Sequence, residues 1–328
     1  MTRLALYGES FPLAQTFTIS RGSKTTAEVF VVELSRDGHT GRGESVPYPR
    51  YDETIVGATA AIEALRPRIE AGTLNRASLQ DALSPGAARN ALDCALWDLE
   101  AKLSGQPVHQ LAGLCTPHSV TTAYTLSLAA PEAMGQAAAV NADRPLLKIK
   151  LGGDGSDLDR IEAIRANAPD ATLIVDANEG WSAPQVEPLS AELAQRGVAL
   201  IEQPLPAGQD ALLAELEHPV PLCADESCHT TSDLEALATR YECVNLKLDK
   251  TGGLTEALLL VTKAKDLGLE LMVGCMVATS LAMAPAALLA PQARYVDLDG
   301  PLLLKQDREH GLHYDGSLLH PPQADLWG

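Results

Sequence analysis

Acidic side chains end three short apolar runs in the second half of the sequence. Asp176 lies in TLIVDAN, Glu202 in ALIEQPL and Asp225 in PLCADES. None of these acids has a basic neighbour in the sequence to pair with, so acids that converged would repel one another unless a cation neutralised them. Carboxylate oxygens without His or Cys suit Mg²⁺ better than zinc. The three acids therefore predict a magnesium site.

Lysines occupy the same kind of position in two other runs. Lys148 and Lys150 are two residues apart in LLKIKLG, so on a strand they share one face, and Lys247 lies in CVNLKLD. A lysine beside a divalent cation and other ammonium groups has a lowered pKa, and its neutral amine can act as a base. Lys150 and Lys247 are predicted to remove and return an α-proton on opposite faces of a carbon, with Lys148 in an electrostatic role.

A parallel barrel would bring these residues together. From about residue 120 the chain alternates apolar runs with amphipathic segments such as DLDRIEAIRANA, and no GxGxxG follows the first run. The carboxyl ends of barrel strands meet at one mouth. We predict a (β/α)₇β-type TIM barrel over residues 116–307, with these strands: TAYTLSL, LLKIKLG, TLIVDAN, ALIEQPL, PLCADES, CVNLKLD, ELMVGCM and YVDLDG.

The first part of the chain has a different texture. Strand-like FTIS and EVFVVEL are separated by residues 21–24, and the turn Arg36-Asp37-Gly38 follows them. From Glu53 to about Gly113 the pattern is helical, as in ARNALDCALWDLEAKLSG. We predict a small α+β domain over residues 1–115, completed by residues 308–328, which contain the strand-like GLHYDGSLLH.

Composition narrows the class of protein. A formal charge of -18 over 328 residues argues against a nucleic-acid partner. The six cysteines form no CxxC pair, and we expect them to be reduced. No stretch approaches the roughly 18 apolar residues of a membrane span, and no signal-like apolar region opens the chain. We expect a cytoplasmic protein without a membrane partner; a homo-oligomer is left open.

Any one of these charged residues, taken alone, is as readily interpreted as a solvated loop residue as a site residue. Their order along the chain (lysines, three acids, then a lysine) resembles the enolase superfamily, muconate-lactonizing subgroup. That subgroup carries a KxK pair on the second barrel strand, acids on the third to fifth and a lysine on the sixth. The resemblance implies an N-terminal domain that caps the barrel mouth and a Mg²⁺ ion that assists proton transfer.

Within the subgroup the chain is most similar to bacterial dipeptide epimerases of the L-Ala-D/L-Glu type. The shared motifs are ISRG, GESVPYPRY, GAARNALDCALWDLEAK, GCM and DLDGP. By this resemblance Asp297 and Asp299 hold the substrate ammonium group and Arg21 meets a side-chain carboxylate. It also implies substrate contacts from Tyr48, Cys275 and Met276, and conversion of L-Ala-L-Glu to L-Ala-D-Glu in murein peptide metabolism.

Three alternatives remain open at this stage. An N-acylamino-acid racemase, o-succinylbenzoate synthase or cycloisomerase would use the same lysines and metal, but its substrate lacks the ammonium group that Asp297 and Asp299 would bind. A Schiff-base aldolase would need one lysine and no acidic triad. A non-catalytic binding protein would tolerate loss of a ligand or lysine, and none is missing.

Overall fold

The N-terminal sheet lies between two hydrophobic cores. The computed structural model describes all 328 residues, and its first three strands form an antiparallel sheet: β1 (Arg3–Ile19), β2 (Gly22–Arg36) and β3 (His39–Ser45). Along β2, Val29 and Val31 join the large core, whereas Phe30, Val32 and Leu34 join a smaller one. Successive side chains of a strand point to opposite faces, so EVFVVEL is apolar throughout because both faces are buried.

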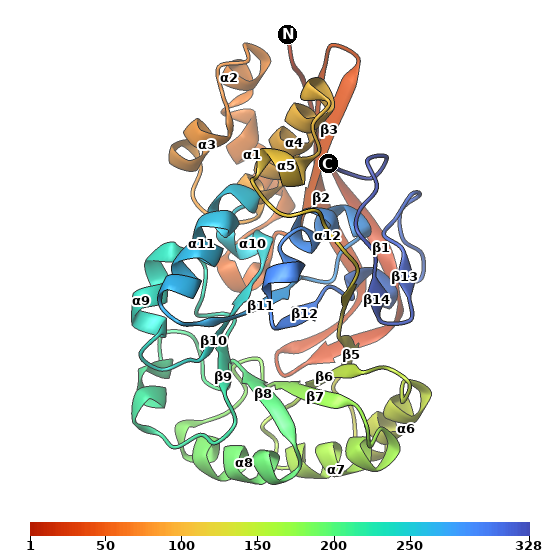
Figure 1. Cartoon of the computed structure of the whole chain (residues 1–328), viewed down its shortest axis with the longest axis vertical. Coiled ribbons are helices and arrows are strands. Elements are labelled where there is room, and N and C mark those ends of the chain that lie inside the picture. The colour runs from red at the N-terminus through yellow and green to blue at the C-terminus, as the bar shows by residue number, and fades with distance from the viewer.

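Helix α4 (Ala87–Ser104) packs directly on β3. Two glycines allow this approach: a Cβ at Gly43 would lie 2.1 Å from the carbonyl oxygen of Ala91, and one at Gly41 would lie 2.3 Å from the nitrogen of Leu99. The other helices of this part of the chain are short: η1 (Pro49–Tyr51), α1 (Ile55–Glu63), α2 (Arg66–Glu70), α3 (Arg76–Ala82) and α5 (Val108–Leu111). Of these, α1, α3 and α5 contact α4, and α2 packs on β1 (Figure 1).

The second half of the chain forms a parallel sheet of eight strands in sequential order. All eight predicted runs form its strands, which are β5 (Tyr124–Leu126), β6 (Leu146–Lys150), β7 (Thr172–Asp176), β8 (Val198–Glu202), β9 (Leu222–Ala224), β10 (Cys243–Leu246), β11 (Glu270–Gly274) and β12 (Tyr295–Asp297). The backbone nitrogen of Ala123 donates to Val296 O at 2.8 Å, which brings the first and last strands together. The predicted barrel is confirmed.

Helices connect most of these strands and cover the outside of the barrel (Figure 1). They are α6 (Pro131–Val140), α7 (Asp157–Asn167), α8 (Ala183–Gln195), η2 (Asp210–Glu215), η3 (Thr231–Asp233), α9 (Leu234–Leu237), α10 (Leu248–Thr251), α11 (Leu254–Asp266), α12 (Ser280–Ala287) and η4 (Ala290–Gln292). A further short helix, η5 (Gly300–Leu303), follows the last strand. None of the helices combines the length and apolar character that a membrane span needs.

The chain after Asp307 contacts both parts of the molecule. Strands β13 (Tyr314–Asp315) and β14 (Leu318–Leu319) do not join the N-terminal sheet; they pair with β4 (Val120–Thr121), just before the barrel. Trp327 and Gly328 reach α4: the Trp327 indole donates to Cys94 O at 3.1 Å and the Gly328 nitrogen donates to Asp98 Oδ1 at 2.8 Å. The domain boundaries drawn from the sequence remain a prediction.

The β1–β2 hairpin reaches from the N-terminal domain to the barrel, as Figure 1 shows. Near its tip, the Thr18 nitrogen donates to Ser127 Oγ at 2.7 Å and Thr18 O accepts from the Leu128 nitrogen at 3.0 Å. The strand before the tip is longer than FTIS, since β1 begins at Arg3 and pairs with β2 on both sides of an irregularity between Pro12 and Phe17. The hairpin thus places residues 17–24 over the carboxyl ends of the barrel strands.

Candidate active site at the carboxyl ends of the barrel strands

Along the barrel strands, the side chains that face the interior change from apolar to mostly polar between one inward-facing position and the next. The apolar part of the interior takes one residue from or next to each strand: Ala123, Leu146, Ile174, Leu200, Cys223, Cys243, Met272 and Tyr295. Side chains two positions further along a strand face the same way. Those positions, which we call the inner polar layer, hold Thr125, Lys148, Asp176, Glu202, Asp225, Asn245, Gly274 and Asp297.

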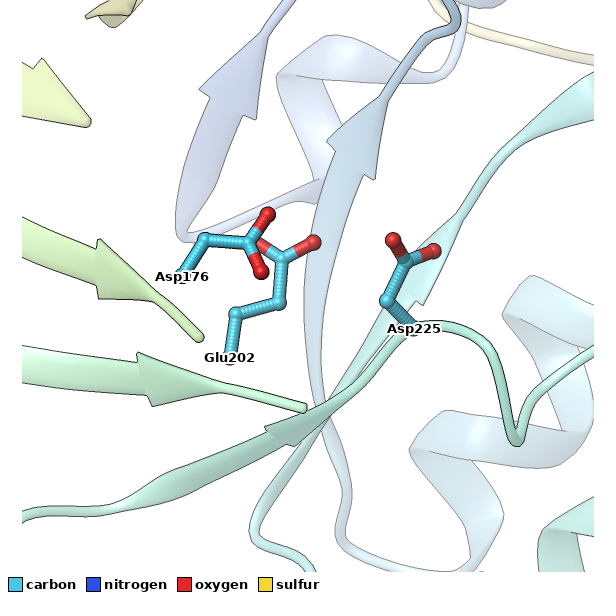
Figure 2. A group of neighbouring side chains, drawn as sticks. All are labelled: Asp176, Glu202 and Asp225. Carbon is cyan, nitrogen blue, oxygen red and sulfur yellow. The ribbon is translucent and has the colours of Figure 1, made fainter. Parts of the chain in front are cut away.

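Three acids of this layer form the predicted cluster. Figure 2 shows Asp176, Glu202 and Asp225 at the ends of the consecutive strands β7, β8 and β9, with their carboxylates turned toward one another. One oxygen from each lies within 4.8 Å of the others, and all three side chains are buried. Buried carboxylates this close require positive charge, and an all-oxygen set suits a hard divalent cation. The residues present therefore fit Mg²⁺.

One oxygen of each acid contacts a lysine. Lys150 Nζ lies 2.6 Å from Asp176 Oδ2, and Lys247 Nζ lies 2.6 Å from Asp225 Oδ2. Lys148 Nζ lies 2.7 Å from Glu202 Oε2, although the two groups are not aligned as a hydrogen bond. Lys148 also lies 2.7 Å from Asp297 Oδ2. All three predicted lysines are thus brought to the acidic cluster.

The other oxygen of each acid is held by a different donor. Asp176 Oδ1 accepts from the Asn178 backbone nitrogen at 2.8 Å. Glu202 Oε1 accepts from Asn245 Nδ2 at 2.8 Å, and Asp225 Oδ1 accepts from Lys250 Nζ at 2.6 Å. None of these three donors was assigned a role from the sequence. Each carboxylate therefore has one oxygen on one of the three predicted lysines and one on a second donor.

The pKa values of Lys148 and Lys247 differ from the lowered values expected beside a divalent cation. Burial lowers the pKa of Lys148, but the carboxylates of Asp297 and Glu202 outweigh burial and raise it. For Lys247, burial is likewise outweighed, chiefly by Asp225. The carboxylates that attract these ammonium groups are the ones that would bind the cation, so protein groups alone favour charged lysines.

Within the same network, the pKa values of two of the acids are shifted in opposite directions. Burial raises the pKa of Glu202 to about 7, and repulsion from Asp176 adds to the rise. Burial also opposes the charge of Asp176, but Lys150 and Lys148 outweigh it and lower the pKa to about 2. Of the two, Asp176 is the acid that the lysines keep ionised.

A cavity of about 390 Å³ opens above this layer, between the barrel and the N-terminal domain. Of the predicted site residues, ten line it: Arg21, Tyr48, Lys148, Lys150, Asp225, Lys247, Cys275, Met276, Asp297 and Asp299. Asp176 and Glu202 lie below, covered by the lysines. The lining also includes Phe17, Lys24 and Tyr51, to which no individual role was given from the sequence.

Arg21 faces this cavity, but its guanidinium group is already bonded. It lies 2.6 Å from Glu226 Oε1 and 2.9 Å from Glu179 Oε2, and it donates to Asn178 O at 2.7 Å. Glu179 also accepts two hydrogen bonds from Arg50, at 2.8 and 3.0 Å. These ion pairs hold the hairpin tip and the loop around η1 on the barrel. Arg21 is therefore placed at the cavity as predicted, with two glutamates of the protein as its partners.

Two charged residues of the cavity have no oppositely charged partner. Asp299 Oδ2 accepts from the Thr125 nitrogen at 2.6 Å, and no cation of the protein forms an ion pair with Asp299. Burial, followed by the charge of Asp297, raises the pKa of Asp299 to about 7. The half-buried Lys24 contacts no carboxylate; burial lowers its pKa to about 8, with further lowering by Lys150 and Lys247. The cavity thus offers one unpaired acid and one unpaired base.

Fold and site together define a capped TIM-barrel enzyme with a carboxylate triad and lysines on opposite strands. Residues 1–113 match the mandelate racemase/muconate lactonizing enzyme N-terminal domain, and residues 132–325 match the enolase C-terminal domain-like family. The chain belongs to this family of the enolase superfamily, and its relatives are isomerases. The Schiff-base aldolase and binding-protein alternatives are thereby set aside.

Two curated relatives are each 49% identical to this chain. One is an L-Ala-D/L-Glu epimerase of Escherichia coli, with 98% of this chain and 100% of the relative covered. The other is an N-acetyl-D-glutamate racemase of a Pseudoalteromonas species, with 92% and 95% covered. The family therefore includes near relatives that act on a dipeptide and on an acylated amino acid.

Two solved structures show the same architecture with ligands. An enolase family member from Agrobacterium tumefaciens, with bound sodium and L-Ala-L-Glu, has a TM-score of 0.98 at 52% identity, with 100% of both chains covered. A dipeptide epimerase from Enterococcus faecalis, complexed with Mg and L-Leu-L-Tyr, has a TM-score of 0.89 at 29% identity. That comparison covers 97% of this chain and 96% of the other.

Proposed function

We propose that the protein is a magnesium-dependent dipeptide epimerase that inverts the α-carbon of the second residue, with L-Ala-L-Glu as its leading substrate. The observation that carries this proposal is the pair of unpaired charges, Asp299 and Lys24, in the cavity above the triad. A dipeptide with an acidic second residue has an ammonium group at one end and a carboxylate at the other. Charge matching inside a closed cavity favours such a ligand, since an unpaired buried charge is costly.

The lysines account for inversion. Lys150 ends β6 and Lys247 follows β10, so they approach the cavity from opposite sides of an eight-stranded barrel. One neutral amine accepts the α-proton, and the opposite ammonium group donates a proton to the other face of the same carbon. Lys148 stays charged between Glu202 and Asp297 and stabilises the negative charge that develops between the two transfers.

Asp176, Glu202 and Asp225 would hold the metal. Mg²⁺ bound there would supply positive charge next to the substrate carboxylate, which makes the α-proton more acidic. The proximity of their oxygens and their complete burial support this assignment, as does the likeness to an epimerase complexed with Mg and a dipeptide.

We assign recognition of the acidic side chain to Lys24 rather than to Arg21. Arg21 has two glutamate partners, so its charge is neutralised before substrate arrives. Lys24 lines the same cavity and has no such partner. Arg21 then serves to hold the hairpin tip that carries Lys24. A dipeptide of alanine and glutamate is a substrate that this arrangement suits, and murein peptides are its proposed source, as the resemblance to L-Ala-D/L-Glu epimerases implies.

N-acylamino-acid racemisation is the second candidate, because a relative of equal identity acts on N-acetyl-D-glutamate. Such a substrate presents no ammonium group to Asp299. Incubation of L-Ala-L-Glu, N-acetyl-L-Ala-L-Glu and N-acetyl-L-Glu in D₂O, with deuterium at the α-carbon measured by mass spectrometry, separates the two activities. We expect rapid exchange of L-Ala-L-Glu alone; faster exchange of N-acetyl-L-Glu would replace the dipeptide proposal.

A further inference from the structure

The inner polar layer contains one residue without a side chain, and a neighbouring side chain fills its place. A Cβ at Gly274 would lie 2.5 Å from Asn245 Oδ1 and 2.8 Å from its Nδ2. These are distances at which one of the two residues must move. Asn245 therefore reaches its position only because residue 274 is glycine.

Asn245 uses this position for a single polar contact. Its Nδ2 donates to Glu202 Oε1 at 2.8 Å, whereas its Oδ1 is buried without a hydrogen-bond partner. A buried amide that leaves its acceptor unsatisfied carries a cost, so the contact with Glu202 must compensate for it. Asn245 is fully buried and does not line the cavity, so a substrate role is excluded.

Lys250 makes the equivalent contact with Asp225. Its ammonium group lies 2.6 Å from Asp225 Oδ1 and donates to Asn245 O at 3.0 Å and to Asp225 O. Its side chain is completely buried, behind the carboxylate, whereas Lys247 approaches Asp225 Oδ2 from the cavity. Lys250 thus cannot reach a substrate without breaking three contacts.

We propose that Asn245 and Lys250 are positioning residues, each of which fixes one oxygen of a metal-binding carboxylate and so holds that carboxylate in the orientation seen in the triad, and that Gly274 provides the space Asn245 needs. This inference rests on the metal site of the proposed function. Groups that orient metal ligands in this way contribute roughly 10- to 100-fold to metal affinity. The third acid, Asp176, needs no such side chain because the Asn178 backbone nitrogen holds its Oδ1.

Metal affinity of the full-length protein, measured with Mn²⁺ by EPR titration in the absence of substrate, tests this placement. Asn245→Leu removes the donor, and Gly274→Ala displaces it without altering any polar group. We expect each to weaken Mn²⁺ binding by roughly 10- to 100-fold. The double variant should bind no more weakly than Asn245→Leu alone, because Gly274 acts only through Asn245.

Two matched controls separate positioning from general damage. Asn90→Leu removes another buried amide, one that donates to Asp249 Oδ1 at 3.0 Å. Gly135→Ala fills another buried glycine, on α6 outside the barrel. Both should bind Mn²⁺ like the unmodified protein, even where thermal unfolding shows a loss of stability.

Lys250→Met should also weaken Mn²⁺ binding. If that variant does not fold, the Asn245 and Gly274 variants still test the inference. Unchanged affinity in Asn245→Leu, an equal loss in Asn90→Leu, or additive losses in the double variant would each overturn the inference. Failure of the unmodified protein to bind Mn²⁺ would instead overturn the metal site itself.

Discussion

The inner polar layer and the capping loops face one cavity but hold their charges differently. In the layer, Lys148 is 1% exposed and contacts three acids. On the loops, Arg21 and Arg50 are 26% and 38% exposed and share Glu179. Removing one partner of a buried network leaves an uncompensated charge, whereas partly exposed pairs contribute little each. The reaction chemistry therefore depends on buried residues that cannot be changed singly, while recognition of the substrate's acidic side chain lies on a loop residue that can be changed alone.

The largest effect should follow from disturbing the triad. Glu202→Gln keeps the size of the side chain but removes a metal-binding charge, so we expect epimerisation to fall below detection while circular dichroism stays unchanged. Excess chelator should inactivate the unmodified protein, and added Mg²⁺ should restore it. Full activity in chelator would show that the layer works without a metal.

Loss of one base should be nearly as severe and should reveal which face it serves. Lys150→Ala and Lys247→Ala should each lower kcat by roughly 10²- to 10⁴-fold, because each removes one proton-transfer group. In D₂O, each variant should still exchange the α-proton of one epimer, detected by NMR. Equal exchange of both epimers by both variants would contradict the two-base mechanism.

On the loops, Lys24→Met should act on one class of substrate. Contacts to a charged partner contribute about 1.5–3 kcal/mol, so kcat/KM for L-Ala-L-Glu should fall roughly 10- to 100-fold. The value for L-Ala-L-Leu should change little. Arg21→Met is the matched variant. If kcat/KM for L-Ala-L-Glu fell selectively in Arg21→Met and not in Lys24→Met, Arg21 rather than Lys24 would contact the substrate's side-chain carboxylate.

The pH dependence of binding should depend on Asp299. Its carboxyl group, whose pKa is raised to about 7, must be ionised to bind ammonium, so kcat/KM should fall as pH drops below 7. A substrate α-amino group with a pKa of about 8 loses its charge at higher pH, so kcat/KM should also fall as the pH rises above 8. Asp297, Lys148 and Cys275 also face this region, and Glu202, whose pKa is likewise raised to about 7, contributes to the same acid limb. Asp299→Asn is therefore the control: activity is lower, and the acid limb should become shallower.

The smallest effect should come from changing Glu179, which forms ion pairs with both Arg21 and Arg50. Glu179→Gln weakens the ion pairs to both Arg21 and Arg50, each worth about 0.2–1 kcal/mol, so KM should rise a few-fold with kcat nearly unchanged. Hydrogen exchange should increase in residues 17–24 and 47–51 together. Arg50→Gln should loosen only the second loop; faster exchange in neither segment would separate Glu179 from loop closure.

The inner layer was largely predictable because strand ends in a parallel barrel converge whatever the connecting segments do. The eight strands were predicted from their apolar runs, and that rule then brings the three acids and Lys148 of the layer together, with Lys150 and Lys247 two positions further along their chain segments. Asn245 was missed, although a signal existed: it stands two residues after the apolar Cys243, as Asp176 stands after Ile174. Counting inward-facing positions along each strand would have identified it.

The loops were less predictable because their roles depend on distant partners. Arg21 and Lys24 are both basic residues of one hairpin tip, and nothing in that tip distinguishes them. Their difference arises from Glu179 and Glu226, which lie more than 150 positions away. The strand pair within residues 314–319 shows the same limit: its pattern predicts strands but does not identify β4 as their partner.

The contacts between the last residues of the chain and α4 can form only late in folding. Trp327 is buried against Cys94, and the Gly328 nitrogen donates to Asp98 Oδ1 at 2.8 Å, both on α4. These contacts span about 230 positions, so during synthesis α4 leaves the ribosome long before its last partner exists. Non-local contacts of this length form late and slow folding. The nascent N-terminal domain must therefore wait, with part of α4 uncovered, until the barrel has been synthesised.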